Sequence, residues 1–382
     1  MLSRSDANGS EAAMTFDLER IVRKNIRNLK PYSSARSEFE GSAEMFLDAN
    51  ENAFGSPAGD GLNRYPDQQQ TKLKQRLAVE KGLKTSQIFV GNGSDEAIDL
   101  LFRIFCEPGR DEAIICPPTY GMYRVSADIN DVSVKEIRLT DDFQLDTAAI
   151  LAGIGDASKL IFICSPNNPT GNLMRRESIV EIAQKFSGIV VVDEAYIHFA
   201  GEPSMIAELE NIPNLVVLQT FSKAWGMAGA RVGLAFGSRA IINLMNRVKP
   251  PYNVSELAQR AVLDAFENEN RVKDWIEATR RERFALAETL AGFDSVETVY
   301  PSDANFLLVK VAYANETYKY LIDEKIVVRN RNNVALCEGC LRITVGTPDE
   351  NKRLKEVLKK RYPAKTQETQ SRTGERKFDC EH

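Results

Sequence analysis

The sequence predicts an α/β fold, in which a large domain with a mainly parallel open sheet covered by helices precedes a smaller α+β domain. Two observations indicate this arrangement. Over the first two thirds of the chain, short apolar runs alternate with stretches of helical period, as in a parallel sheet with crossover helices. The pattern changes at Pro250-Pro251, where a long charged stretch begins and a second set of short strands follows.

Buried strands are expected where the apolar runs are short and bounded by turn residues. They are Ile88–Val90, Ala113–Cys116, Leu160–Cys164, Ile189–Val192, Val216–Thr220 and Val232–Phe236. Asp95–Cys106 instead carries apolar residues at a helical spacing, namely Ile98, Leu101, Phe102 and Phe105. Ligands bind such sheets beyond the carboxyl ends of the strands, so the residues at those ends are the candidates for function.

The second domain is expected to begin at the Pro-Pro hinge. A long charged helical stretch is predicted from about Ser255 to Leu290, and the strands that follow are Phe306–Val311, Ile326–Arg329 and Leu341–Val345. The expected limits are a disordered extension at 1–20, an N-terminal arm at 21–55, a large cofactor-binding domain at 56–250, a small domain at 251–362 and a disordered tail at 363–382.

Composition excludes several classes of protein. A chain of 382 residues is long for one core, so two domains are expected. The net charge is −5 and no basic stripe is present, which argues against nucleic acid. No apolar run approaches the roughly 20 residues that span a bilayer. The six cysteines are scattered and residues 1–13 lack the apolar core of a signal peptide, so a cytoplasmic protein is expected.

The residue types also limit the chemistry. The histidines are His198 and His382, and the surroundings of His198 lack the spacing of a catalytic triad or a metal site. Cys337 and Cys340 form a CxxC pair without a second pair, so packing is a better interpretation than zinc. We predict no metal site, and catalysis is left to lysine, tyrosine, carboxylate or a cofactor.

One lysine lies in a setting that suits a Schiff base. In the segment Gln219–Arg231, Lys223 follows an apolar strand and precedes a glycine-rich run. Thr220, Ser222 and Arg231 could hold a phosphate, because a guanidinium offers two parallel N–H donors. The segment suggests that Lys223 holds pyridoxal phosphate covalently, although a lysine after a serine is usually a plain surface residue.

A carboxylate ends another buried strand. Asp193 directly follows Ile189–Val192, and a buried carboxylate is costly unless it is paired. A pyridinium N–H is a suitable partner, because at about 4 Å and an effective dielectric near 20 the attraction is roughly 4 kcal/mol. Such a pair would keep the ring protonated and make it an electron sink. A metal-ligand or capping role is disfavoured, since no histidines or clustered carboxylates accompany Asp193.

A glycine-containing turn follows the first predicted strand. Gly93, Ser94 and Asp95 lie where this strand meets the next helix. Free backbone N–H groups at such a turn can bind an anion, but an ordinary capped turn is an equally good interpretation.

Two other strand ends carry an amide and an aromatic ring. Asn168, in the loop Ser165–Gly171, can donate a hydrogen bond to a phenolate-type oxygen, although Asn-Pro-x-Gly is also common turn chemistry. Tyr120 could stack on the face of a pyridine ring or simply pack in the core.

Together these motifs resemble the fold-type I aminotransferases that depend on pyridoxal phosphate, from about Asn25 to Tyr362. Within that group the chain is most similar to the histidinol-phosphate aminotransferases. The distinguishing stretches are Asn28–Arg36, Leu47–Asn52, Arg64–Asp67, Cys116–Tyr123 and Gly339–Gly346.

The resemblance implies a role for each matching residue. Lys223 is the Schiff-base lysine and proton shuttle, and Asp193 holds the ring nitrogen. Asn168 and Tyr196 contact the ring oxygen, while Tyr120 stacks on the ring. The phosphate is bound by Gly93, Ser94, Asp95 (through its backbone N–H), Thr220, Ser222 and Arg231, and by Tyr65 of the partner subunit. The substrate is bound by Asn50, Arg329 and Arg342, and by Tyr32 of the partner subunit.

The implied reaction converts histidinol phosphate and 2-oxoglutarate to imidazole acetol phosphate and glutamate by a ping-pong cycle, within histidine biosynthesis. Arg329 and Arg342 suit both substrates, because a planar guanidinium binds phosphate as well as carboxylate. A homodimer with shared active sites is implied as the assembly. An aromatic amino acid aminotransferase, a phosphothreonine-type decarboxylase and a binding module without turnover remain as alternatives.

Overall fold

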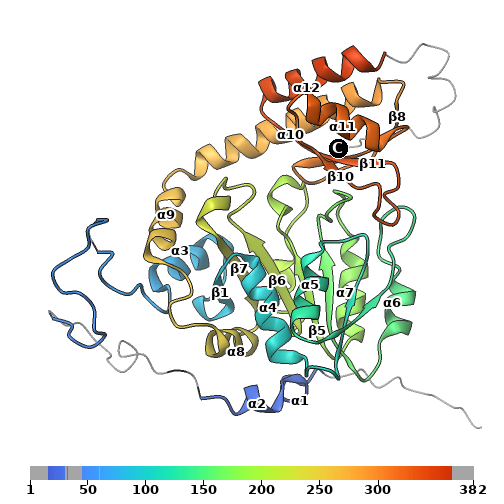
Figure 1. Ribbon diagram of the computed structural model, residues 1–382. Helices are drawn as coiled ribbons and strands as arrows, with labels where there is room; N and C mark the ends of the chain where they lie inside the picture. The colour runs from blue at the N-terminus through green and yellow to red at the C-terminus, as the bar shows by residue number, and fades with distance from the viewer. Residues whose placement is uncertain (1–15, 31, 33–44, 60, 364–382) are drawn as a thin grey trace, which may run out of the picture.

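The computed structural model describes residues 16–30, 32, 45–59 and 61–363 (Figure 1). Residues 1–15 and 364–382 lie outside this part of the chain, and with them most of the two segments expected to be disordered. The same holds for Ser33–Arg36 of the distinguishing stretch near the start of the chain. The described residues form two sheets, with the larger in the lower part of Figure 1 and the smaller above it.

The larger sheet has seven strands in the order β1-β7-β6-β5-β4-β2-β3. They are β1 (Ile88–Asn92), β2 (Glu112–Ile115), β3 (Ser133–Glu136), β4 (Ser158–Cys164), β5 (Ile189–Asp193), β6 (Leu215–Thr220) and β7 (Val232–Gly237). β3, β2, β4, β5 and β6 run parallel, whereas β7 is antiparallel to both of its neighbours, β1 and β6. This confirms the predicted fold, and the six predicted strands form with ends shifted by at most two residues.

Helices cover both faces of this sheet. They are α3 (Thr71–Lys81), α4 (Ser94–Phe105), α5 (Met122–Ile129), α6 (Thr147–Gly153), α7 (Arg176–Lys185) and α8 (Arg239–Val248). Because side chains alternate along a strand, Val190 and Val192 of β5 pack in one core with α3, α6 and α7. Ile189 and Val191 pack in the other core, with α4, α5 and α8. The short helices α1 (Leu18–Ile21) and α2 (Lys24–Arg27) flank this second core.

Helix α4 buries the apolar face that its sequence predicts. Ile98, Leu101, Phe102 and Phe105 are all fully buried. The ring of Phe102 stacks on Phe162 of β4, with centroids 5.2 Å apart. Burial of side chains of this size stabilises the fold by about 1.5–3 kcal/mol each. This packing sets the first turn of α4 at the carboxyl edge of the sheet.

The smaller sheet is antiparallel, in the order β10-β11-β9-β8. Its strands are β8 (Val296–Val299), β9 (Phe306–Val311), β10 (Arg329–Asn330) and β11 (Cys340–Thr344), with the helices α11 (Ala314–Asp323) and α12 (Pro348–Arg361). The prediction of a strand at Ile326–Arg329 was wrong except for its last residue. The N–H of Ile326 donates instead to the carbonyl of Leu321 at the end of α11, so this backbone closes a helix and not a sheet.

The helical stretch predicted from about Ser255 to Leu290 is confirmed, and it consists of two helices. The stretch forms α9 (Glu256–Phe266) and α10 (Glu269–Ala291), separated by Glu267 and Asn268. The backbone of Asn268 accepts hydrogen bonds from the N–H groups of Arg271 and Val272. It therefore begins a new helix where the charge pattern shows no break.

Helix α10 joins the two parts of the molecule (Figure 1). Nη1 of Arg283 donates to the carbonyl of Ala304, just before β9, at 2.7 Å, and to the carbonyl of Phe199 at 3.4 Å. Nε of Arg280 donates to the same Phe199 carbonyl at 3.1 Å. The 3₁₀ turn η3 (Ile197–Phe199) follows β5, so these bonds tie the end of β5 to the start of β9.

The other short 3₁₀ turns are η2 (Thr85–Gln87), η4 (Met205–Glu208) and η5 (Ala228–Ala230). Among the described residues, none of the helices has both the length and the apolar composition needed to cross a membrane.

Replacing Arg283 with alanine is expected to lower the free energy of unfolding by about 1.5–3 kcal/mol, because hydrogen bonds from a half-buried guanidinium to two carbonyls are lost. Urea unfolding measures the change. Arg281→Ala is the matched control. Arg281 lies two residues before Arg283 on the same helix and is exposed, so its replacement should change the free energy of unfolding by less than about 0.5 kcal/mol. Equal effects of the two substitutions would contradict the proposed joining role of Arg283.

Candidate active site

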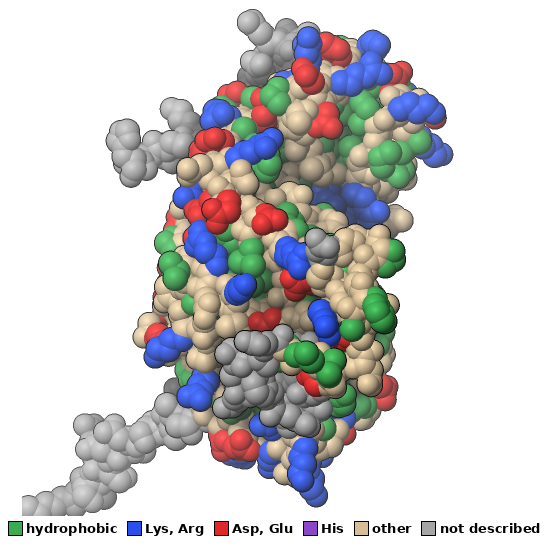
Figure 2. Space-filling model, turned by 90° about the vertical axis from the view of Figure 1, so that its left-hand side faces the viewer, with side chains coloured by type: hydrophobic (Ala, Val, Ile, Leu, Met, Phe, Trp, Pro, Cys, Tyr) green, Lys and Arg blue, Asp and Glu red, His purple; other side chains and the backbone are tan. Residues whose placement is uncertain are grey.

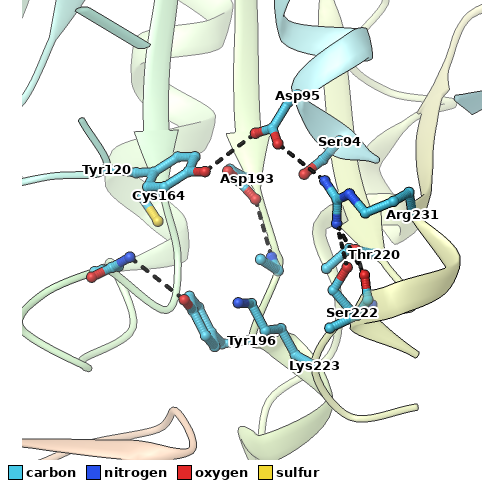
Figure 3. Close-up of a pocket in the computed structure, with 13 residues that line it drawn as sticks. Ser94, Asp95, Tyr120, Cys164, Asp193, Tyr196, Thr220, Ser222, Lys223 and Arg231 are labelled. Carbon is cyan, nitrogen blue, oxygen red and sulfur yellow. Dashed lines mark hydrogen bonds and ion pairs between the residues drawn. The ribbon is translucent and has the colours of Figure 1, made fainter. Parts of the chain in front are cut away.

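A cavity of about 160 Å³ opens at the carboxyl ends of β4, β5 and β6 and at the start of α4 (Figure 3). It is lined by Ser94, Asp95, Tyr120, Cys164, Asn168, Asp193, Ala195, Tyr196, Thr220, Ser222, Lys223, Ala228 and Arg231. Every residue predicted to bind a cofactor is therefore on its wall except Gly93 and Tyr65. The parallel strands bring these side chains together from segments far apart in the sequence.

Asp193 lies at the base of the cavity with its carboxylate buried, at 3% exposure. The hydroxyl of Tyr123 donates to Oδ2 at 2.8 Å, and the N–H of Ala195 donates to Oδ1 at 3.1 Å. Burial nevertheless raises the pKa of Asp193 from 3.8 to about 6, because the hydrogen bonds only partly offset desolvation. A cation placed against this carboxylate would reverse the shift, so the site suits a protonated ring nitrogen.

An anion-binding cup lies on the side of the cavity at the start of α4. Nη1 of Arg231 donates to Oγ of Ser222 at 3.3 Å, and the N–H of Ser222 donates to Oγ1 of Thr220 at 3.1 Å. Ser94 begins α4, whose free N–H groups carry partial positive charge. Three hydroxyls, a guanidinium and a helix start therefore face the same space, as a phosphate requires.

Two glycines allow this close approach. Gly93 has φ +80°, and a Cβ on it would lie 2.6 Å from Nη2 of Arg231. A Cβ on Gly233 of β7 would lie 2.1 Å from the backbone nitrogen of Ser94. Gly93 thus belongs to the cup through its backbone, and any larger side chain at either position would push the arginine or the helix start away.

The carboxylate of Asp95 joins Tyr120 to Arg231 across the top of the cavity (Figure 3). The hydroxyl of Tyr120 donates to Oδ1 at 3.2 Å, and Nη2 of Arg231 lies 3.3 Å from Oδ2. The sequence resemblance implied only a backbone role for Asp95. In the structure its side chain also orients the aromatic ring and the guanidinium.

Lys223 points its amine toward Tyr196, with Nζ 5.6 Å from the ring centroid. Burial is the main cause of a lowered pKa at Lys223, and the positive charge of Arg342 adds to it. A larger fraction of neutral amine makes the lysine a better nucleophile. The residue is nevertheless exposed in the single chain, so the confinement expected from its surroundings is incomplete on one side.

The second sheet places a cation against the wall of this cavity, at Asn168. Nη1 of Arg342, on β11, donates to Oδ1 of Asn168 at 2.5 Å, and its guanidinium lies 5.2 Å above the ring of Phe306. Nδ2 of Asn168 donates to the hydroxyl of Tyr196 at 3.5 Å. Burial raises the pKa of Tyr196 above its usual value, so its hydroxyl stays protonated and can donate to a ligand oxygen.

Besides Gly93 and Arg342, four predicted residues do not line this cavity. Tyr65 stacks on Tyr252, with centroids 4.4 Å apart, and together with Asn50 it lines a separate, open cavity of about 480 Å³. Tyr32 is 70% exposed. Arg329, on β10, is exposed and pairs in register with Arg342.

The sequence patterns missed three neighbours of the site. Tyr123 binds Asp193 and lies one helical turn after Tyr120, a spacing that could have indicated it. Cys164 lines the cavity as the last residue of β4, and burial raises the pKa of its thiol. Arg331 lies close enough to Tyr196 to act on its ionisation. No sequence signal distinguishes Arg331 from the charged residues around it.

The described residues contain no cluster of histidine, cysteine or carboxylate side chains that could hold a metal ion. His198, in η3, is partly buried and does not line the cavity. Cys337 and Cys340 are buried free thiols in a hydrophobic core, which supports the packing interpretation.

The chain resembles known proteins over most of its length. The family model for class I and II aminotransferases matches residues 40–358. A histidinol-phosphate aminotransferase of Cytophaga hutchinsonii is 51% identical over 346 residues, which cover 91% of this chain and 99% of that protein. One from Parabacteroides distasonis is 52% identical over 343 residues, with 90% and 98% covered.

A solved structure resembles the fold. It is the crystal structure of histidinol-phosphate aminotransferase from Sinorhizobium meliloti in complex with pyridoxal-5'-phosphate, with a TM-score of 0.72 and 25% sequence identity. The match covers 82% of this chain and 90% of that chain.

Replacing Asp193 with asparagine should stabilise the ligand-free protein by about 1–3 kcal/mol at pH 7.5. The folded protein has a raised pKa of about 6 at this residue, so between about pH 4 and 6 it binds more protons than the unfolded chain, and stability falls as pH rises. Chemical unfolding from pH 4 to 8 measures this slope, which Asp193→Asn should flatten. The exposed Asp274 provides the control Asp274→Asn. An unchanged slope would contradict the buried charge.

Proposed function

Since the chain belongs to the class I and II aminotransferase family, we propose that it is a histidinol-phosphate aminotransferase that uses pyridoxal phosphate. It would transfer an amino group between histidinol phosphate and 2-oxoglutarate, with imidazole acetol phosphate and glutamate as products. The observation that carries the proposal is the convergence of Lys223, Asp193 and Arg231 on one cavity. They would serve the aldehyde, the ring nitrogen and the phosphate of a single molecule.

The cavity fits pyridoxal phosphate group by group. The carboxylate of Asp193 is buried at the base, the cup at Arg231 has hydroxyl and helix N–H donors, and Tyr120 offers an aromatic face. The amide of Asn168 and the hydroxyl of Tyr196 could each donate a hydrogen bond to a ring oxygen. When bound, the cofactor supplies an electron sink for negative charge at the substrate's Cα.

Each of the protein's own residues then has a separate role in the reaction. Lys223 holds the cofactor through its amine and, once released, moves a proton at the substrate's Cα, for which its lowered pKa suits it. Asp193 keeps the ring nitrogen protonated. Arg231 and its hydroxyl neighbours hold the phosphate and so prevent rotation of the ring. Arg342 binds the substrate's anionic group from the second sheet.

The names of the relatives favour histidinol phosphate over the two enzymatic alternatives. The two relatives that are 51% and 52% identical to this chain are both histidinol-phosphate aminotransferases. Arg342 is compatible with this choice, because a guanidinium accepts the phosphate of one substrate and a carboxylate of the other. The chain belongs to a family of enzymes, which disfavours a binding module without turnover.

We also propose a homodimer in which each active site is shared. Lys223 is exposed in the single chain, and the side chain of Arg231 is 48% exposed. Tyr65, Asn50 and Tyr32 lie on the surface, away from their own cavity. A second copy of the chain that covers the open side of the cavity could bring its Tyr65 to the anion-binding cup. A cytoplasmic location is proposed as well, since the five described cysteines are free thiols.

Single-turnover kinetics should show amino transfer from histidinol phosphate to the cofactor at a higher kcat/KM than from phenylalanine. Phosphothreonine should give no decarboxylation. Absorbance of the cofactor and detection of carbon dioxide measure the two outcomes. Lys223→Ala is the negative control and should lose covalent cofactor attachment while it keeps the fold. A faster reaction with phenylalanine would contradict the proposed substrate. Release of carbon dioxide from phosphothreonine would contradict the proposed reaction.

A shared site predicts complementation between two impaired chains. Lys223→Ala lacks the lysine and Tyr65→Ala lacks the donor from the partner, so a hybrid dimer would contain one intact site of two. Random mixing yields half hybrids and hence about one quarter of the wild-type activity. Mixing Lys223→Ala with the double variant that carries both changes should restore nothing. Hybrid dimers without recovered activity would show that each site is built within one chain.

A further inference from the structure

Three arginines share one face of the smaller sheet. Arg329 of β10 pairs in register with Arg342 of β11, so their side chains lie on the same face. The N–H of Arg331 donates to the carbonyl of Cys340 at 2.9 Å, which continues the pairing for another step. Because side chains alternate along a strand, Arg331 joins Arg329 and Arg342 on that face. We call these three residues the arginine face.

The arginine face is directed at the active site. Arg342 contacts Asn168 of the cavity wall. Both Arg342 and Arg331 lower the pKa of Tyr196, whose overall pKa is raised mainly by burial. Figure 2 shows blue side chains of lysine and arginine gathered at the level where the upper and lower parts of the molecule meet. Arg342 and Arg331 therefore place positive charge beside Asn168 and Tyr196 of the cavity wall.

Within the described residues, no ion pair joins any of these three arginines to a carboxylate. Burial and the charges of Arg342 and Arg329 lower the pKa of Arg331. Its other electrostatic neighbours are Cys337 and Tyr196, and the pKa of each is raised, so both are neutral at physiological pH. Three guanidiniums without a counter-charge repel one another, and an anionic ligand would relieve that repulsion.

Two of the guanidiniums also hold unused donors. Nε of Arg331 and Nε of Arg342 are buried and have no hydrogen-bond partner. Buried polar groups in folded proteins nearly always have partners, and exceptions concentrate at functional sites. The backbone of Arg331 is fully engaged, since its N–H binds Cys340 and its carbonyl accepts from the N–H of Val334. The fold of this loop therefore depends on the backbone of Arg331 and leaves its side chain available.

We propose that Arg331 is a specificity-determining residue that, with Arg342 and Arg329, selects a phosphate dianion over a carboxylate in the substrate. The inference rests on the proposed function and deepens it. Coulomb attraction is proportional to the ligand's charge, so a third cation favours a dianion twice as strongly as a monoanion. A phosphate ester also has three terminal oxygens to accept from three guanidiniums, whereas a carboxylate has two.

The position of the anionic group supports the same assignment. In histidinol phosphate the phosphorus is farther along the chain from Cα than the carboxyl carbon of an amino acid. A phosphate would extend past Arg342 toward its neighbours on the arginine face. Arg342 would then serve both substrates, and Arg331 would act mainly on the phosphorylated one.

The test compares Arg331→Gln, Arg331→Lys and the control Arg353→Gln in the holoenzyme. Arg353 lies on α12, where its ion pair with Glu324 spans 3.6 Å. For Arg331→Gln we expect kcat/KM with histidinol phosphate to fall about 10- to 100-fold, as for loss of a charged hydrogen bond. The values for glutamate should fall less than about threefold, and those for histidinol, which has no phosphate, should not change. Arg331→Lys should restore part of the preference because it keeps the charge.

A binding measurement separates this inference from the proposed function. Calorimetric titration of the holoenzyme with inorganic phosphate should give a weaker Kd for Arg331→Gln than for wild type and Arg353→Gln. If wild type binds phosphate through Arg331 but does not turn over histidinol phosphate, the proposed substrate fails and the anion site stands. Equal losses with all substrates, or unchanged values for histidinol phosphate and phosphate, would overturn the role of Arg331.

Discussion

The buried carboxylate of Asp193 is the constraint on which the rest of the site depends. It ends the central strand β5, accepts hydrogen bonds from Tyr123 and the backbone of Ala195, and still has a pKa raised to about 6 by burial. A buried carboxylate with a raised pKa on the wall of a cavity is typical of a ligand-binding site. The strands β4 and β6 lie on either side of β5, so the residues at their carboxyl ends lie at the edges of a ligand that is bound at Asp193.

The site is divided between the two sheets according to what each part must hold. Apart from Tyr65 of the partner subunit, the contacts proposed for the cofactor come from the ends of the larger sheet's strands and from the loops and the helix α4 beside them. The smaller sheet supplies the arginines proposed for the substrate. The ring of Phe306 on β9 meets the ring of Tyr196 with centroids 5.1 Å apart, and α10 bonds to both segments. Packing thus sets the distance between cofactor and substrate contacts.

Positive charge dominates the space between the sheets. Lys223, Arg231, Arg331 and Arg342 surround a region in which Asp193 is buried at the base and Asp95 is already paired with Arg231. A cofactor phosphate and an anionic substrate together supply the negative charge that these cations lack. The same balance explains how one site can accept two substrates in turn, because each brings an anion to Arg342.

The sequence by itself determined the fold class and most of the residues that line the cavity. Asp193 and Thr220 end apolar strands and Asn168 lies in the loop after another, and parallel strands all end at one edge of a sheet. Only the tertiary structure decided which residues meet from separate segments. Arg331 joins Arg342 through strand register, and the break in the helix at Asn268 comes from local capping. Tyr65 lies outside the cavity of its own chain because it packs against Tyr252, which is distant in the sequence. Periodicity encodes which face of an element is buried, but it contains no information on which distant element will cover that face.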